Sequence, residues 1–181
     1  VTWGSPRIRR ALQETYDRWY GWDIDPDREV TVTCGATEAM AAALLAVVDP
    51  GDEVVVVEPF YENYGPDAIL CGARPVWVPM ERTHDQGGMR FVLDLDRLRA
   101  AFTSETRAIV LNTPNNPSGH VFSRAELEAV AELCREHDCV AFTDEIYEHI
   151  RYDGEHIPLA SREGMRERTV TISGASKTFS V

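Results

Sequence analysis

The sequence predicts a three-layer α/β/α fold in which a mostly parallel sheet lies between helices. Short β-branched runs alternate along the chain with Ala- and Leu-rich helical patterns, and several of the runs are apolar almost throughout. Strands that are covered on both faces have this continuous apolar character. Polar motifs directly follow four of the runs, and ligands bind at the carboxyl ends of parallel strands. We therefore expect the functional residues to lie together at that edge of the sheet.

The expected strands are runs rich in Val, Ile and Thr that end at turn-forming residues. They cover residues 29–33, 53–57, 75–78, 107–112, 139–143 and 168–172.

Helical patterns fill intervals between these runs. Residues 37–48 are rich in Ala and Leu and end at residues 49–52 (DPGD), a turn that cannot continue a helix. Ser123 and Glu126 have the spacing of a capping box, and an apolar stripe follows on one helical face, formed by Leu127, Val130, Ala131 and Cys134. Residues 84–88 are expected to form a loop.

Composition and charge limit the class of protein. The chain has 181 residues, of which 44% are hydrophobic, so it can bury the core of one domain. Its net charge of −12 repels nucleic acid and anionic membranes, so a phosphate group would have to be held locally.

The chain contains neither a run of about 18 apolar residues nor the charge order of a signal peptide, which favours a cytoplasmic protein. The spacing of the four cysteines is not that of a disulfide framework, so we expect them to be reduced thiols. They are Cys34, Cys71, Cys134 and Cys139.

The first candidate site residues follow the run 29–33. Gly35, Ala36 and Thr37 end an expected strand and open an expected helix, so free backbone N–H groups and the Thr37 hydroxyl could hold a phosphate. An ordinary strand-to-helix turn explains the same residues equally well, because both the Walker lysine motif and the dinucleotide glycine fingerprint are absent.

A carboxylate follows the strand expected at 139–143. Asp144 would be costly to bury in an ionised form unless it met a cation or several donors, and a ring pyridinium N–H is such a partner. Such a pairing keeps the ring able to accept electrons from a substrate carbanion. Tyr147 is three residues further on, on the same face of an expected helix, and could place its hydroxyl beside the same ligand. Alternatively, Asp144 caps a following helix.

Residues 112–119 (NTPNNPSG) combine many turn formers, and such a loop can have no further role. However, Asn116 precedes a proline, which restricts its backbone and would fix its amide as a directional donor. Tyr61 could stack on a flat ring, although core packing is the ordinary role of a single aromatic residue.

Lys177 lies in residues 173–180 (SGASKTFS), where small neighbours leave room for a flat, phosphorylated ligand. An amine acts as a nucleophile when its environment lowers its pKa. The histidines lack metal-ligand spacing, and no Gly-x-Ser-x-Gly motif presents a serine nucleophile. We therefore expect no metal site, and Lys177 is the candidate covalent residue.

Together these motifs resemble the large domain of fold-type I pyridoxal-phosphate aminotransferases of class I/II. Residues 112–119, 143–147 and 176–180 match that family in type, order and separation, and the resemblance covers nearly all of the chain. A closer similarity to the kynurenine/glutamine/methionine aminotransferase branch rests on residues 58–61 (EPFY), 152–154 (YDG) and 164–169 (GMRERT).

The resemblance implies a role for each candidate residue. Lys177 would bind pyridoxal 5'-phosphate as a Schiff base and then move a proton, Asp144 would pair with the pyridine nitrogen, and Tyr147 would contact the ring hydroxyl. Ala36 and Thr37 would bind the phosphate with help from Ser173 or Ser176. Many relatives have a serine three residues before the lysine, where this chain has Gly174, so the resemblance does not decide between the two serines. The implied cofactor-binding residues are Ala36, Thr37, Tyr61, Asn112, Asn116, Asp144, Tyr147, Ser176 and Lys177.

The implied activity is the transfer of an amino group between an L-amino acid and a 2-oxo acid by a homodimer. A β-lyase, a cyclopropane-carboxylate-synthase-like enzyme or an aminotransferase-like effector domain of a transcription regulator would share the cofactor residues. The chain lacks an initial Met and ends soon after Lys177. We therefore expect residues 1–181 to be a cofactor-binding large domain truncated at both ends, without the substrate-binding arginine and most of the small domain.

Overall fold

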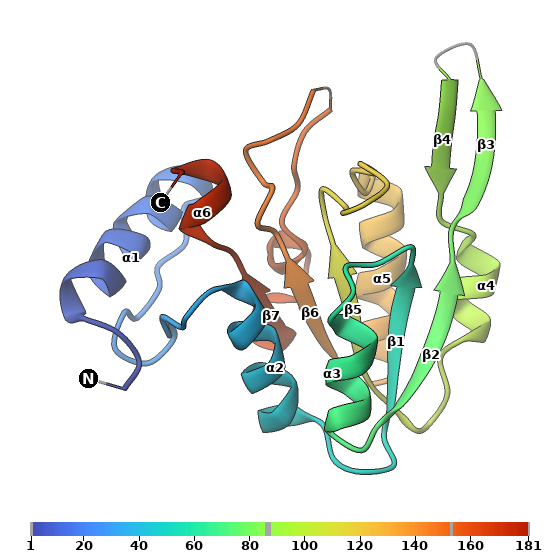
Figure 1. Cartoon of the computed structure of the whole chain (residues 1–181), viewed down its shortest axis with the longest axis horizontal. Coiled ribbons are helices and arrows are strands. Elements are labelled where there is room, and N and C mark those ends of the chain that lie inside the picture. The colour runs from blue at the N-terminus through green and yellow to red at the C-terminus, as the bar shows by residue number, and fades with distance from the viewer. Residues whose placement is uncertain (1, 86–87, 153, 181) are drawn as a thin grey trace.

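The computed structural model describes residues 2–85, 88–152 and 154–180, and its centre is a five-stranded parallel sheet (Figure 1). The strand order is β2-β1-β5-β6-β7, and all four neighbouring pairs are parallel. Five of the six expected strands are confirmed within about two residues, as β1 Glu53–Glu58, β2 Arg74–Pro79, β5 Thr106–Asn112, β6 Val140–Asp144 and β7 Thr169–Ile172.

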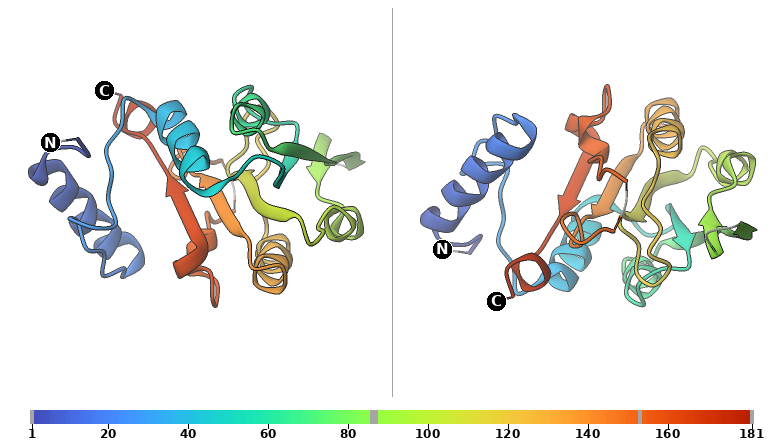
Figure 2. Two further views of the ribbon diagram at one scale, coloured as in Figure 1. Left: turned by 90° about the horizontal axis from the view of Figure 1, so that it is seen from below. Right: turned by 90° about the horizontal axis from the view of Figure 1, so that it is seen from above.

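Helices cover both faces of this sheet, which confirms the three-layer architecture (Figure 2). Helices α2 (Ala36–Val47) and α3 (Tyr64–Leu70) pack on one face. Helices α4 (Leu95–Ala100) and α5 (Arg124–Glu136) pack on the other. The buried apolar residues accordingly form two clusters, one on each side of the sheet.

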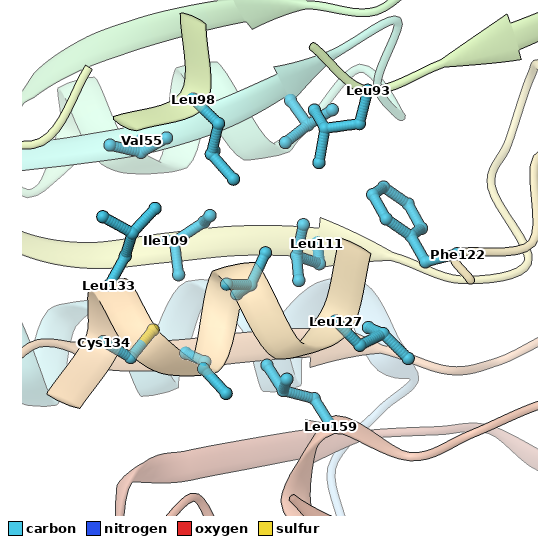
Figure 3. Close-up of a cluster of buried hydrophobic side chains, with 14 of the residues drawn as sticks. Val55, Leu93, Leu98, Ile109, Leu111, Phe122, Leu127, Leu133, Cys134 and Leu159 are labelled. Carbon is cyan, nitrogen blue, oxygen red and sulfur yellow. The ribbon is translucent and has the colours of Figure 1, made fainter. Parts of the chain in front are cut away.

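The larger cluster fills the space between α5, α4 and the sheet (Figure 3). Helix α5 begins at the expected capping box, in which the Ser123 hydroxyl and the Glu126 carboxylate each accept a hydrogen bond from the other residue's backbone N–H. This start places the predicted apolar stripe against the strands, and Leu127 is fully buried. The four cysteines are free thiols, and all but Cys34 are buried.

The strand expected at residues 29–33 is wrong. Backbone pairing with a neighbouring strand is absent there in the described residues, and the Val32 N–H instead donates to the Trp3 carbonyl at 3.2 Å. A cavity of about 610 Å³ has the run on one side and residues of β7 on the other. A β-branched run becomes a strand only where a second backbone supplies a ladder of hydrogen bonds, and a single bond to Trp3 does not form one.

A hairpin replaces most of the loop expected at residues 84–88. Strands β3 (Glu81–Asp85) and β4 (Gly88–Val92) pair antiparallel, and residues 86–87 lie outside the described residues.

The remaining helices are α1 (Pro6–Tyr20), α6 (Ala175–Thr178) and two short 3-10 helices, η1 (Leu159–Ser161) and η2 (Arg166–Arg168). In the described parts of the chain, no helix has both the length and the apolar character needed to cross a bilayer.

Candidate active site

A cavity of about 300 Å³ lies beyond the carboxyl ends of β1, β5 and β6. The chain passes from β1 to β2 on one side and then returns to β5 on the other, so the cavity lies where the direction of strand progression reverses. Parallel α/β sheets bind ligands at such points. All nine residues expected to bind a cofactor line this one cavity, namely Ala36, Thr37, Tyr61, Asn112, Asn116, Asp144, Tyr147, Ser176 and Lys177.

Asp144 is the last residue of β6, and its backbone is fixed from the neighbouring strand. Its carbonyl oxygen accepts hydrogen bonds from the Asn112 side-chain amide at 2.9 Å and from the Thr113 N–H at 3.1 Å. The Asn112 side-chain oxygen in turn accepts from the Asn116 N–H at 2.6 Å. The loop after β5 and the end of β6 are therefore held together by buried amides.

The alternative role of Asp144 as a helix cap is wrong, because residues 146–149 form a turn and not a helix. Within that turn, Asp144 Oδ1 accepts a hydrogen bond from the Ile146 N–H at 3.2 Å. Tyr147 lies in the same turn and still lines the cavity, although it does not share a helical face with Asp144.

The Asp144 carboxylate is buried and is bound by a tyrosine that sequence reasoning did not assign to it. The Tyr64 hydroxyl donates to Asp144 Oδ2 at 2.6 Å, from the first turn of α3. Burial raises the pKa of Asp144, and hydrogen bonds from Tyr64 and the Ile146 N–H oppose that rise. The pairing joins residues 80 positions apart and has no signature in local spacing.

The N-terminus of α2 supplies donors for an anion. Gly35 is the N-cap with a φ of 96°, a conformation that L side chains rarely adopt. The first N–H groups of a helix have no carbonyl partner within the helix, and the helix dipole favours negative charge there. Ala36 and Thr37 are the first two residues of this 12-residue helix, and Thr37 is exposed.

Lys177 belongs to the short helix α6, and its Nζ atom lies 5.8 Å from the centre of the Tyr147 ring. Its side chain is exposed, so the cavity is open on this side. Lys177 is also the only lysine among the 181 residues, and this compositional signal is independent of the motif around it. Arginine stays protonated in proteins, whereas lysine can lose its proton and react.

The structure distinguishes between the two candidate serines. Ser176 lines the 300 Å³ cavity, whereas the Ser173 hydroxyl donates to Glu148 Oε1 at 3.1 Å. Gly174 packs closely against Ile146, because a Cβ atom there would lie 3.0 Å from Ile146 Cδ1. A serine at position 174 would therefore need Ile146 to move.

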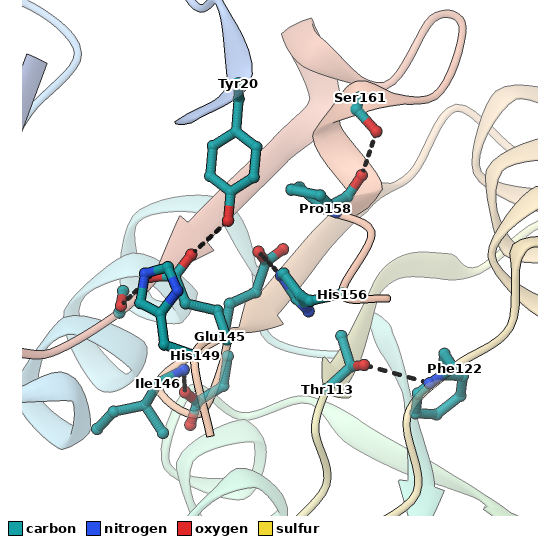
Figure 4. Close-up of polar contacts among 12 residues, drawn as sticks. Tyr20, Thr113, Phe122, Glu145, Ile146, His149, His156, Pro158 and Ser161 are labelled. Atoms are coloured by element: carbon teal, nitrogen blue, oxygen red, sulfur yellow. Dashed lines mark hydrogen bonds and ion pairs between the residues drawn. The ribbon is translucent and has the colours of Figure 1, made fainter. Parts of the chain in front are cut away.

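A second buried polar cluster involves residues that directly follow Asp144 in the chain (Figure 4). Glu145 Oε2 and His156 Nε2 are 2.7 Å apart, with at most 2% of either side chain exposed. The Tyr20 hydroxyl donates to Glu148 Oε2 at 2.8 Å, which ties α1 to the turn after β6. Burial raises the pKa of Glu145, and His156 partly offsets this effect. Sequence analysis found no role for His156, since its partner is 11 residues away in an irregular segment.

Comparison with known proteins agrees with this geometry. The family model described as "Aminotransferase class I and II" matches residues 2–181. A probable N-succinyldiaminopimelate aminotransferase of Mycobacterium tuberculosis is 49% identical over 97% of this chain and 44% of its own length. Human kynurenine–oxoglutarate transaminase 1 is 48% identical over 99% of this chain and 44% of its own length. The chain thus spans less than half the length of these relatives.

Solved structures show the same fold. The structure of N-succinyldiaminopimelate aminotransferase from Mycobacterium tuberculosis superposes with a TM-score of 0.93 and 48% identity, covering 99% of this chain and 46% of that one. A Thermus thermophilus aspartate aminotransferase double mutant superposes with a TM-score of 0.88 and 40% identity, covering 98% of this chain and 44% of that one. The resemblance noted in the sequence is therefore confirmed, and the chain belongs to the aminotransferase class I and II family.

Proposed function

We propose that the full-length protein is a pyridoxal-phosphate-dependent aminotransferase that transfers an amino group from an L-amino acid to a 2-oxo acid. The observation that carries this proposal is the content of one cavity, which holds a buried carboxylate, a helix N-terminus, an aromatic ring and the only lysine of the chain. Elimination chemistry and a regulatory effector role lack a comparable observation in their favour.

The residues present fit pyridoxal phosphate. The N–H groups of Ala36 and Thr37 with the Ser176 hydroxyl would hold the phosphate, since helix N-termini bind such anions. Asp144 would pair with the ring nitrogen, and Tyr61 would cover the ring. Asn116 and Tyr147 would contact the ring hydroxyl. When bound, the cofactor supplies an electron sink that stabilises negative charge at the substrate Cα.

The side chains of this chain provide the remaining chemistry. Lys177 would hold the cofactor. Once the substrate has displaced it, the free Lys177 amine would accept the proton from the substrate Cα and donate it to C4′ of the cofactor. Asp144 would keep a proton on the ring nitrogen, because a buried carboxylate is stabilised by a cationic partner. Burial of that carboxylate at the end of β6 also excludes the water that would weaken the pairing.

We further propose that residues 1–181 form the cofactor-binding large domain and that the protein is a cytoplasmic homodimer. These proposals rest on the family, the net charge of −12 and the free cysteines. The names of the relatives describe those proteins, and we propose for this one only the general substrate pair of an amino acid and a 2-oxo acid.

The decisive experiment uses the full-length protein loaded with pyridoxal phosphate. Borohydride reduction followed by peptide mass spectrometry should place the cofactor on Lys177, and Lys177→Ala should abolish both the adduct and amino transfer. Lys177→Arg is the matched variant, because it keeps the positive charge and cannot form the bond.

A screen of amino donors with and without a 2-oxo acid then tests the reaction. Product formation should require the oxo acid. Steady release of ammonia without an oxo acid would contradict the proposal and indicate elimination, and an adduct on a different residue would contradict the assignment of Lys177.

A further inference from the structure

The hydrogen bond between Tyr64 and Asp144 is short and joins two buried side chains that line the 300 Å³ cavity. The donor-to-acceptor distance is 2.6 Å, and the exposed fractions are 2% for Tyr64 and 7% for Asp144. Hydrogen bonds with a charged acceptor are short and about twice as strong as neutral ones. Tyr64 is held in place because its ring contacts Tyr61 and Phe60, with centroids 5.9 Å and 6.5 Å away.

Asp144 depends on few donors. In residues 2–85, 88–152 and 154–180, the donors to its side chain are the Tyr64 hydroxyl and the Ile146 N–H, and its carboxylate has no ion pair with Lys or Arg. The other titratable side chains that line the cavity are Tyr61, Tyr147 and Lys177. Tyr64 is therefore one of only two groups that directly stabilise the ionised form of this carboxylate.

Tyr64 also stays protonated. Burial and the nearby Asp144 raise the pKa of its phenol far above the usual range. It therefore acts as a permanent donor and does not compete for the proton that Asp144 shares with a ligand.

We propose that Tyr64 is a positioning residue that, through its hydrogen bond to Asp144, keeps the shared proton on the ring nitrogen of the bound cofactor. This inference rests on the proposed function. A donor to the carboxylate makes it a weaker base, so the proton stays on the nitrogen. Without the donor, the carboxylate draws the proton toward itself, and the positive charge of the ring decreases.

The first test measures Asp144 in the full-length protein freed of cofactor. The carboxyl ¹³C resonance of Asp144, assigned by its disappearance in Asp144→Asn, is followed against pH in the wild type and in Tyr64→Phe. We expect the dissociation constant of this carboxyl proton to fall about tenfold in Tyr64→Phe, the equivalent of one charge-assisted hydrogen bond.

Tyr61→Phe is the matched control, since it removes a hydroxyl from the same cavity that has no hydrogen bond to Asp144 among the described residues. It should leave the titration of Asp144 unchanged. An Asp144 titration that is the same in Tyr64→Phe and wild type would overturn the proposal, as would an equal shift in Tyr61→Phe.

The second test measures the loaded protein. A less positive ring holds the proton on the adjoining nitrogen, contributed by Lys177, more tightly. The pH midpoint of the absorbance change of the bound cofactor should therefore move to higher pH in Tyr64→Phe. A wild type that never acquires this absorbance overturns the proposed function and this inference together. A normal wild type with an unshifted Tyr64→Phe midpoint overturns this inference alone.

Discussion

Replacing Glu126 by glutamine should destabilise the protein through three segments at once, because its carboxylate joins them at the start of α5. Oε2 accepts hydrogen bonds from the Ser123 N–H and hydroxyl, both at 2.7 Å. Oε1 accepts from the Leu93 N–H at 3.3 Å and lies 3.1 Å from His120 Nε2. His120 belongs to the loop after β5 that also carries Asn116 of the candidate site.

The magnitude follows from these contacts. In glutamine an NH₂ group replaces one of the two carboxylate oxygens. Either the Ser123 N–H and hydroxyl or the Leu93 N–H and His120 therefore lose the oxygen atom that they contact. A hydrogen bond to a charged group contributes about 1.5–3 kcal/mol, and a helix cap contributes about 1 kcal/mol. We expect Glu126→Gln to lower the free energy of unfolding by about 2 kcal/mol at pH 7. Glu128→Gln is the matched control on the same helix, where a partly exposed ion pair with Arg135 contributes about 1 kcal/mol or less.

The pH dependence provides an independent check. Burial acts to raise the pKa of Glu126, but hydrogen bonds from His120 and Ser123 outweigh it and lower the pKa from 4.5 to about 2. A lowered folded-state pKa contributes stability that is complete above pH 4.5 and is lost as the pH falls toward about 2. The stability difference between wild type and Glu126→Gln should therefore shrink over that interval. Urea unfolding of the full-length protein at pH 7, 4 and 3, followed by circular dichroism, measures it. A difference that is independent of pH, or no larger than that of Glu128→Gln, would refute the reasoning.

Two further predictions concern packing, and both are measured by urea or thermal unfolding of the full-length protein. Leu127→Ala leaves a cavity at a fully buried site and should cost about 3 kcal/mol, whereas Leu45→Ala, at a residue that is 64% exposed, should change stability by less than about 0.5 kcal/mol. Equal effects would show that Leu127 is not part of the core. Gly65→Ala places a Cβ atom 2.6 Å from Trp77 Cη2. The overpacking should cost about 1–3 kcal/mol of folding free energy, more than the gain of about 1 kcal/mol from the higher helix propensity of alanine, so the variant should be less stable. A higher melting temperature would mean that the Trp77 ring moves aside easily.

Local sequence patterns account for most of the fold, as two elements illustrate and one exception explains. The apolar run at 53–57 became β1, because a run apolar on both faces can be buried only inside a covered parallel sheet. The capping box at Ser123 correctly set the start of α5, since its hydrogen bonds span only three residues. The run at 29–33 has equal strand character but lacks a partner, and strand formation depends on that partner and not on propensity.

The sequence by itself predicted the candidate site residues and the family. Motifs that follow β1, β5, β6 and β7 converge because those strands are parallel, whereas Ala36 and Thr37 reach the cavity at the start of α2. The sequence could also identify Lys177, the one amine in a chain that otherwise uses arginine. Only the tertiary structure decided which groups surround these residues. It placed Ser176 rather than Ser173 in the lining of the 300 Å³ cavity, joined Tyr64 to Asp144 across 80 residues, and paired Glu145 with His156. Such contacts depend on how separate helices and turns pack against the sheet, and packing between distant segments leaves no periodic pattern in the sequence from which it could be read.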